Sequence, residues 1–189
     1  MNLAISRPTT RSRSEVSLSF FSLLFAELVA NCVETNDEHL EVRLHRMGAD
    51  LGARIFPLLH LRERPFRRES KPIACLQFIA LTAWRSLFGK VAEVMTTDQP
   101  GEYYLVDRGM ILNKYISVSE SEANANSMVN CAYFAAGIIE GMMQIASFKD
   151  TRVDAVFTHA GSLLVVDDPM NVTFVVRIDG AARKSISLS

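Results

Sequence analysis

The chain has 189 residues, of which 49% are hydrophobic and 22% are charged, and its formal net charge is −1. This length and apolar fraction predict a single domain whose core needs neither metal nor disulfides. A net charge near zero gives no argument for nucleic acid as a partner. Cys32, Cys75 and Cys131 lie far apart in apolar, helix-patterned segments, so we expect buried, reduced thiols in the cytosol.

The amino-terminal residues 1–13 are polar, which predicts a flexible arm ahead of one domain at 14–180 and a tail at 181–189. Basic residues before the apolar run 18–29 imitate a secretory signal, but Glu27 argues against one. The run is also shorter than the roughly 20 apolar residues that span a bilayer. We therefore expect an amphipathic first helix. Its apolar residues recur at steps of three and four: Phe21, Leu24, Phe25, Leu28 and Cys32.

A second helix is predicted from a capping box at Thr35 and Glu38. One face of this helix is apolar throughout: Leu40, Leu44, Met47, Leu51, Ile55 and Leu58. Pro57 predicts a kink or the final turn, because proline lacks a backbone donor. Gly48 and Gly52 lie four residues apart, where each glycine costs about 1 kcal/mol relative to alanine. They predict a close helix contact, either within the core or across a subunit interface.

A third helix is predicted to begin at Pro72, to present apolar residues inward as far as Leu87, and to end at Gly89. Before it, residues 62–71 contain five basic residues against two acids, together with Pro65. This basic stretch has two interpretations that remain open. It is either an ordinary solvated loop or a surface facing anionic phospholipid, where each basic residue contributes about 1 kcal/mol.

Beyond the third helix, the pattern changes to short alternating pieces at 103–106 and 114–118, which predict strands. Asn130 is expected to cap a fourth helix, in which Gly137 and Gly141 again suggest close packing. Two further strands are predicted, at 153–157 and 172–178. This order predicts an α+β fold, with about four helices packed on one side of a small antiparallel sheet.

No catalytic, cofactor-binding or metal-binding residue is predicted, and we do not expect an enzyme. His39, His45, His60 and His159 include no pair at metal-ligand spacing on a helix. The cysteines lie in apolar stripes, where burial makes a thiol inert. The glycines of the second helix follow no strand and lack the dinucleotide-binding spacing.

Seven segments follow one another in the order found in a known family. They are SEVSLS at 14–19, LLFAELV at 23–29, MGADLGAR at 47–54, RRESK at 67–71, TAWRSLFGK at 82–90, NKYISV at 113–118 and NCAYFAAGIIE at 130–140. Through them the chain resembles the small α/β subunits of TRAPP, the vesicle-tethering transport protein particle, and specifically its subunit-five branch. The resemblance covers about nine tenths of the chain in one consistent order. Residues 161–169 look like an insertion before the last strand.

The resemblance implies a non-catalytic scaffold subunit of a complex that tethers vesicles and activates a Rab GTPase by nucleotide exchange, in ER-to-Golgi and Golgi traffic. It implies a cytoplasmic protein, peripheral at ER and Golgi membranes. The expected partners are a paralogous small α/β subunit, a longin-like small subunit and, through the whole complex, a Rab GTPase. The isolated chain is expected to be able to homodimerise.

Pairing is expected through the first two helices. The predicted interface residues are Phe21, Leu24, Phe25, Leu28, Leu40, Leu44, Met47, Gly48, Leu51, Gly52 and Ile55. Periodicity alone does not decide which of them face the core and which face the partner. Peripheral membrane contact would fall to the basic stretch, namely Arg62, Arg64, Arg67, Arg68 and Lys71.

An alternative function is a module that binds an acyl chain or another small hydrophobic ligand in an internal tunnel. Some subunits of this family carry an acylated cysteine just before the third helix. Counting back from Trp84, that position falls at about Glu69, where there is no thiol. Cys75 lies further along, inside the predicted helix, so acylation is not expected here.

Overall fold

The computed structural model describes residues 16–34, 39–63, 70–114, 130–157 and 170–179. Its elements follow in chain order: α1 Leu18–Glu34, α2 Leu40–Glu63, α3 Pro72–Phe78, η1 Ile79–Ala83, α4 Trp84–Phe88, β1 Glu93–Thr96, β2 Glu102–Arg108, α5 Ile111–Lys114, α6 Tyr133–Ile145, β3 Thr151–Phe157 and β4 Asn171–Ile178. The expected arm at 1–13, the expected tail at 181–189 and the segment 161–169 lie outside the described residues.

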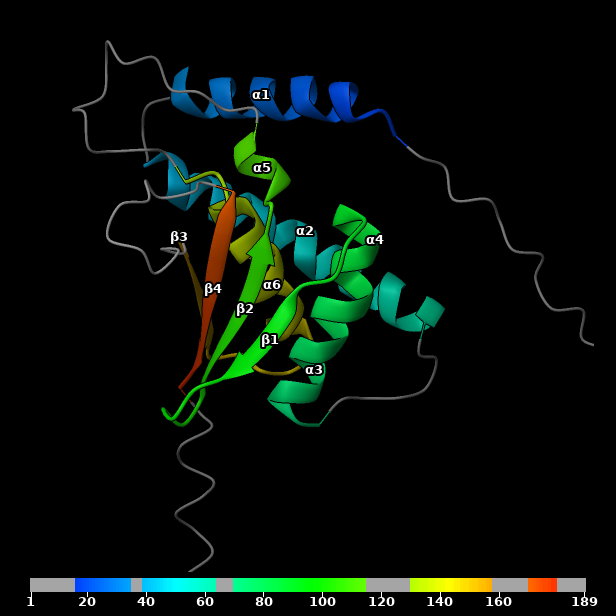
Figure 1. The fold of residues 1–189 in the computed structure, drawn as a ribbon, viewed down its shortest axis with the longest axis vertical. Helices are drawn as coiled ribbons and strands as arrows, with labels where there is room; N and C mark the ends of the chain where they lie inside the picture. Colours follow the sequence, from blue (N-terminus) through cyan, green and yellow to red (C-terminus); the bar gives the residue numbers. More distant parts are fainter. Residues whose placement is uncertain (1–15, 35–38, 64–69, 115–129, 158–169, 180–189) are drawn as a thin grey trace, which may run out of the picture.

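The four strands form one antiparallel sheet in the order β1-β2-β4-β3. Side chains alternate between its two faces, and Leu105, Ala155 and Phe174 are buried on the face that meets the helices. Figure 1 shows the helices gathered on this side of the sheet, with α1 lying across one end of the molecule. The predicted α+β fold, with helices on one side of an antiparallel sheet, is confirmed.

Helices α2 and α6 form the closest helix contact of the core, through glycines on both sides. A Cβ on Gly48 would overlap the carbonyl oxygen of Phe134, and a Cβ on Gly52 that of Ile138. Reciprocally, a Cβ on Gly137 or Gly141 would overlap a backbone carbonyl oxygen of α2. Only glycine lets two backbones approach this closely, so the packing energy of this contact offsets the poor helix propensity of the residue.

The predicted third helix is continuous from Pro72 to its end at Gly89, where φ is +75°. Its middle is the π-helical turn η1, in which the N–H of Trp84 donates to the carbonyl of Ile79. The wider turn leaves the carbonyl of Ala80 to accept a 3.1 Å hydrogen bond from the N–H of Ala92, just before β1. This turn therefore ties the helix to the edge of the sheet.

Two predictions about the helices and strands are wrong. Of the kink or final turn expected at Pro57, the final turn is wrong, because α2 continues for six residues past Pro57 to Glu63. Phe56 and Leu59 are buried on either side of the proline, and Pro57 itself faces solvent. Lys114 ends the helical turn α5 and does not begin a strand. The rest of that predicted strand, 115–118, lies outside the described residues.

The other predicted elements are present, with two differences: the cap of α6 and one strand that was not predicted. The strands β2, β3 and β4 contain the predicted segments 103–106, 153–157 and 172–178. Asn130 is not the N-cap of α6 as expected, because the N-cap residue is Ala132 and no side chain caps the helix. Asn130 lies two residues earlier, and its Oδ1 atom accepts a 3.1 Å hydrogen bond from the N–H of Ala132 in the turn that leads into α6. Strand β1 was not predicted from the sequence, because it has only four residues and a weak alternation.

Candidate subunit interface

Helix α1 is attached to the domain by one narrow stripe of side chains. Phe25, Val29 and Cys32 are buried, and the ring of Phe25 packs edge-on against Phe134 with centroids 5.7 Å apart. The ring of Phe21 stacks on Phe25 at 6.0 Å. These contacts fix one face of α1 and leave its opposite face to solvent.

That opposite face is strongly apolar. The side chains of Phe20, Leu23 and Leu24 are 61%, 73% and 59% exposed. A helix that is apolar on all sides is normally buried on all sides. Single exposed apolar residues are ordinary, but three on one helix face form a patch typical of a protein interaction site.

Helix α2 also carries half-buried apolar side chains, which pack partly against the core. The residues that are partly exposed are Leu40, Met47, Leu51 and Ile55. The sulfur of Met47 lies 3.9 Å from that of Cys32, which places the amino-terminal half of α2 against α1. Near the end of α2, Leu58 and Leu61 are each 68% exposed.

The predicted interface residues divide between the core and the surface. Phe25, Leu44, Gly48 and Gly52 are buried within the chain, and the two glycines contact α6 of the same molecule. Of the two contacts left open for these glycines, the structure therefore shows the one inside the core. The remaining predicted residues are reachable by a partner: Phe21, Leu24, Leu28, Leu40, Met47, Leu51 and Ile55.

Phe20 and Leu23 are exposed residues that periodicity did not select. The spacing of three and four residues identifies the stripe of α1 that faces the core. Phe20 and Leu23 lie on the other side of the helix. A usable signal was present, because apolar residues occur around the whole circumference of this helix.

The basic stretch is described only at its ends. Arg62 is exposed and its Nε lies 3.2 Å from a carboxylate oxygen of the adjacent Glu63. Lys71 is exposed at the start of α3. Arg64, Arg67 and Arg68 lie outside the described residues, so their contact with a membrane stays a prediction.

A histidine and a carboxylate join the two central helices to the sheet. Nε2 of His45 on α2 lies 3.2 Å from the carbonyl oxygen of Val153 and 3.4 Å from Oε2 of Glu140. The same carboxylate accepts the N–H of Val153 at 3.1 Å. The hydrogen bond with Glu140 raises the pKa of His45 above its ordinary value, while partial burial opposes the rise; the Glu140 charge, the Val153 carbonyl and Asp154 add to it.

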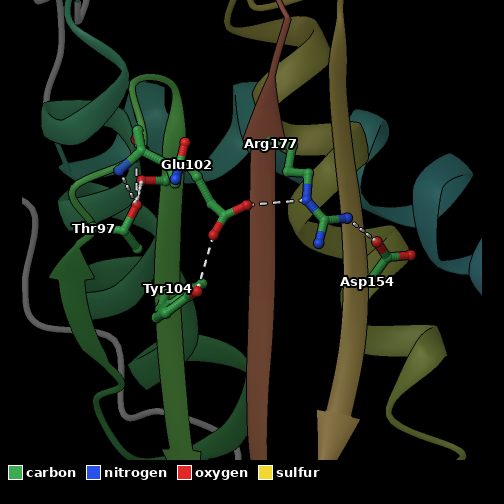
Figure 2. Close-up of polar contacts among 6 residues, drawn as sticks. Thr97, Glu102, Tyr104, Asp154 and Arg177 are labelled. Carbon is green, nitrogen blue, oxygen red and sulfur yellow. Dashed lines mark hydrogen bonds and ion pairs between the residues drawn. The ribbon is translucent and has the colours of Figure 1, made fainter.

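The uncovered face of the sheet carries a ladder of charged side chains (Figure 2). Arg177 on β4 reaches Glu102 on β2 through its Nε at 3.1 Å and Asp154 on β3 through Nη1 at 2.6 Å. The hydroxyl of Tyr104 donates to the other oxygen of Glu102 at 2.9 Å. This ladder of hydrogen bonds and ion pairs links three strands of the sheet.

Within the described part of the chain, no group of three or more His, Cys, Asp or Glu side chains could hold a metal ion. Searched over the same residues, no helix is long and apolar enough to cross a membrane. All three cysteines are buried, and none of them forms a disulfide. Burial, with a smaller contribution from Glu41, raises the pKa of Cys131 to about 12, which keeps this thiol protonated and unreactive.

The described residues define a small α+β domain in which one helix exposes an apolar face. A family model described as "Transport protein particle (TRAPP) component" matches residues 21–179. Trafficking protein particle complex subunit 5 of Bos taurus is 39% identical over 167 residues, covering 86% of this chain and 85% of that protein. The Dictyostelium discoideum subunit 5 is 38% identical over 155 residues, covering 80% of this chain and 81% of that protein.

A solved structure shows the same fold. The crystal structure of a trafficking protein particle complex subunit 3 from Naegleria fowleri, covalently bound to palmitic acid, matches with a TM-score of 0.65 and 19% identity, covering 87% of this chain and 96% of that chain. The chain therefore belongs to the TRAPP component family. Within that family it is similar to subunit 5 over most of its length, which confirms the resemblance found in the sequence.

Proposed function

We propose that the chain is a non-catalytic scaffold subunit of a TRAPP complex, and that it pairs with a paralogous small α/β subunit through α1 and α2. Tethering of vesicles and nucleotide exchange on a Rab GTPase then belong to the assembled complex, in ER-to-Golgi and Golgi traffic. The chain would act in the cytoplasm, peripherally at ER and Golgi membranes, and would also contact a longin-like small subunit.

The observation that carries the pairing is the exposed apolar face of α1. Its inner stripe already packs on the domain through Phe25 and Val29, so the outer residues Phe20, Leu23 and Leu24 find no partner among the described residues. Burying a leucine side chain is worth about 1.5–3 kcal/mol. Burial of this face by a partner would therefore contribute several kcal/mol to the binding free energy. The half-buried apolar residues of α2 would add to the buried surface.

The proposal also includes peripheral contact of the basic stretch with an anionic membrane. It rests on the five basic residues of 62–71 and on the neighbouring exposed leucines, Leu58 and Leu61. Long basic side chains beside exposed apolar ones suit the headgroup region of an anionic bilayer. Two acids lie in the same stretch, so one subunit would bind lipid weakly and the assembly would supply avidity.

The alternative of an internal acyl-binding tunnel receives no support from the described interior. The space between the helices and the sheet is filled by large buried side chains, among them Phe78, Trp84 and Phe174. Trp84 packs on Phe174 with ring centroids 5.4 Å apart. The position at Glu69, which corresponds to the acylated cysteine of related subunits, lies outside the described residues and carries no thiol.

Capture of the chain from cells by an affinity-tagged paralogous subunit tests the proposal. We expect the wild-type chain to co-purify with one paralogue, and a Leu23→Glu, Leu24→Glu double variant to be lost from the complex. The matched control is Ile145→Glu, because Ile145 is 51% exposed at the end of α6 and not on the proposed face. Equal recovery of the double variant and the control would refute pairing through α1.

A further inference from the structure

The two edges of the sheet differ in whether their outward backbone groups have hydrogen-bond partners. Strand β3 forms one edge and β1 the other. At the β3 edge, the N–H of Val153 donates to Glu140, its carbonyl lies 3.2 Å from Nε2 of His45, and the carbonyl of Ala155 accepts from Asn130 at 3.0 Å. These three side chains therefore already make hydrogen bonds with the backbone groups of β3 to which another strand would bind.

The alternation of the backbone identifies the corresponding groups on β1. The N–H of Ile178 donates to the carbonyl of Gly101, so odd-numbered residues of β2 bond toward β4 and even-numbered ones toward β1. Tyr104 and its neighbour Met95 are therefore a hydrogen-bonded pair. By the same alternation, Val94 and Thr96 direct their N–H and C=O groups away from the sheet.

Strand β1 has only one rung on its outer side among the described residues. The N–H of Ala92 bonds to the carbonyl of Ala80, which the π-helical turn has released. The following outward groups, on Val94 and Thr96, have no backbone partner in the described structure. The helix thus provides the backbone acceptor that an additional strand would provide at Ala92. The outward backbone groups of Val94 and Thr96 remain available to a strand.

A groove of about 560 Å³ lies beside this open edge. One wall is helical, with Gln77, Ala80 and Leu81, and the other is formed by Val91, just before β1, and by Val94 of β1. Leu81 and Val91 are 52% and 44% exposed, so solvent reaches apolar side chains in the groove, which also has polar lining residues. Its volume falls in the range of about 300–1,000 Å³ that is usual for binding pockets.

The charges around the groove restrict what it can bind. Glu93 and Arg108 line it and pair with each other at 3.3 Å. Lys90, immediately before the groove residues, is held by Asp107 and by the carbonyl of Gly109 at 2.6 Å. These cations and carboxylates neutralise one another, so the groove complements an uncharged segment and would leave a charged side chain without a counter-ion.

We propose that the β1 edge and this groove are a docking site for an extended, uncharged segment of a partner protein, which adds to the sheet as a fifth strand. Main-chain hydrogen bonds to Val94 and Thr96 would supply binding, and the apolar lining would select small apolar side chains at alternate positions. The site lies on a different part of the molecule from the α1 and α2 surface and does not depend on it.

The test uses the full-length, isotope-labelled chain and a defined probe: an acetylated and amidated hexapeptide of alternating threonine and valine. Two analogues carry N-methyl groups on either all threonines or all valines, so each lacks the donors of one edge. We expect the parent peptide to shift the amide resonances of Val94 and Thr96 and to slow their hydrogen exchange at least about tenfold. One analogue should act like the parent and the other should not bind.

Two variants locate the site. Leu81→Asp places a charge in the groove, and Thr96→Pro removes an outward donor without touching the β1–β2 ladder; each should abolish the shifts. Ile145→Asp is the control, since Ile145 and Leu81 are 51% and 52% exposed, and it should bind like wild type. No shift at β1, or equal binding by both analogues, would overturn the proposal. A peptide-free dimer that Thr96→Pro abolishes would also overturn it, because the occupant would be a second copy.

Discussion

The indole Nε1 of Trp84 donates a 2.7 Å hydrogen bond to Oδ2 of Asp107, and both side chains are buried. The other carboxylate oxygen of Asp107 accepts from the ammonium of Lys90. This cluster joins the start of α4, the turn after it and the end of β2. It gives a physical reason for the TAWRSLFGK segment at 82–90: the tryptophan and the lysine hold the same buried carboxylate.

Removing the carboxylate should therefore destabilise the fold strongly. Asp107→Ala leaves the buried indole N–H of Trp84 without its acceptor, which costs about 1–3 kcal/mol, and removes the ion pair with Lys90, whose ammonium keeps the carbonyl of Gly109. Asp107→Asn keeps an acceptor for Trp84 and should cost less. Urea unfolding of the purified variants measures both. An Asp107→Ala loss below about 0.5 kcal/mol, the usual range for surface substitutions, would contradict the role of this cluster.

The glycines of α2 provide a second prediction: replacing one of them by alanine should lower the free energy of unfolding, although helix propensity alone would raise it. Gly52→Ala would gain about 1 kcal/mol if propensity decided. Because its Cβ would overlap the carbonyl oxygen of Ile138, we expect instead a loss of about 1–3 kcal/mol from overpacking. Asp50→Ala, at an exposed position of the same helix, is the control and should change the unfolding free energy by less than about 0.5 kcal/mol. A Gly52→Ala variant more stable than wild type would refute the close contact.

His45 should make the stability of the domain depend on pH. Its pKa is raised in the folded chain, chiefly by the hydrogen bond with Glu140, whereas an unfolded histidine titrates near about 6.5. The protonated form thus stabilises the fold. This contribution is complete below about pH 6.5 and is lost as the pH rises through the raised folded pKa.

The comparison of wild type with His45→Gln isolates this effect. The wild-type chain should lose more stability than the variant between about pH 6 and pH 9. His39→Gln, at an exposed position before α2, should follow the wild-type profile. Urea midpoints at several pH values provide the measurement, and parallel curves for wild type and His45→Gln would show that His45 is not responsible.

Local pattern was sufficient where local chemistry decides the structure. The paired glycines at 48 and 52 and at 137 and 141 indicated close packing, and Gly89 indicated the end of a helix. The continuation of α2 through Pro57 was not predictable in this way, because it depends on burial of Phe56 and Leu59 against other elements. The π-helical turn was likewise not predicted, because its released carbonyl at Ala80 accepts from the N–H of Ala92, in a segment that the sequence does not show to be a neighbour.

The candidate site was only half predictable for a related reason. Periodicity finds the apolar stripe of a helix but not the object against which the stripe packs. It placed Phe25 and Leu24 in one set, whereas the structure buries Phe25 and exposes Leu24. The exposed positions Phe20 and Leu23 lie off the stripe and become visible only when the covered side of α1 is known.

The central claim is that the exposed face of α1 binds a paralogous subunit. The most direct measurement is the mass, by light scattering after size-exclusion chromatography, of the chain co-expressed with each small α/β subunit of the same cell. We predict a one-to-one heterodimer with one of them for wild type and for Ile145→Glu, and separate monomers for the Leu23→Glu, Leu24→Glu double variant. A wild-type chain that stays monomeric with every paralogue, or a double variant that still forms the heterodimer, would contradict the claim.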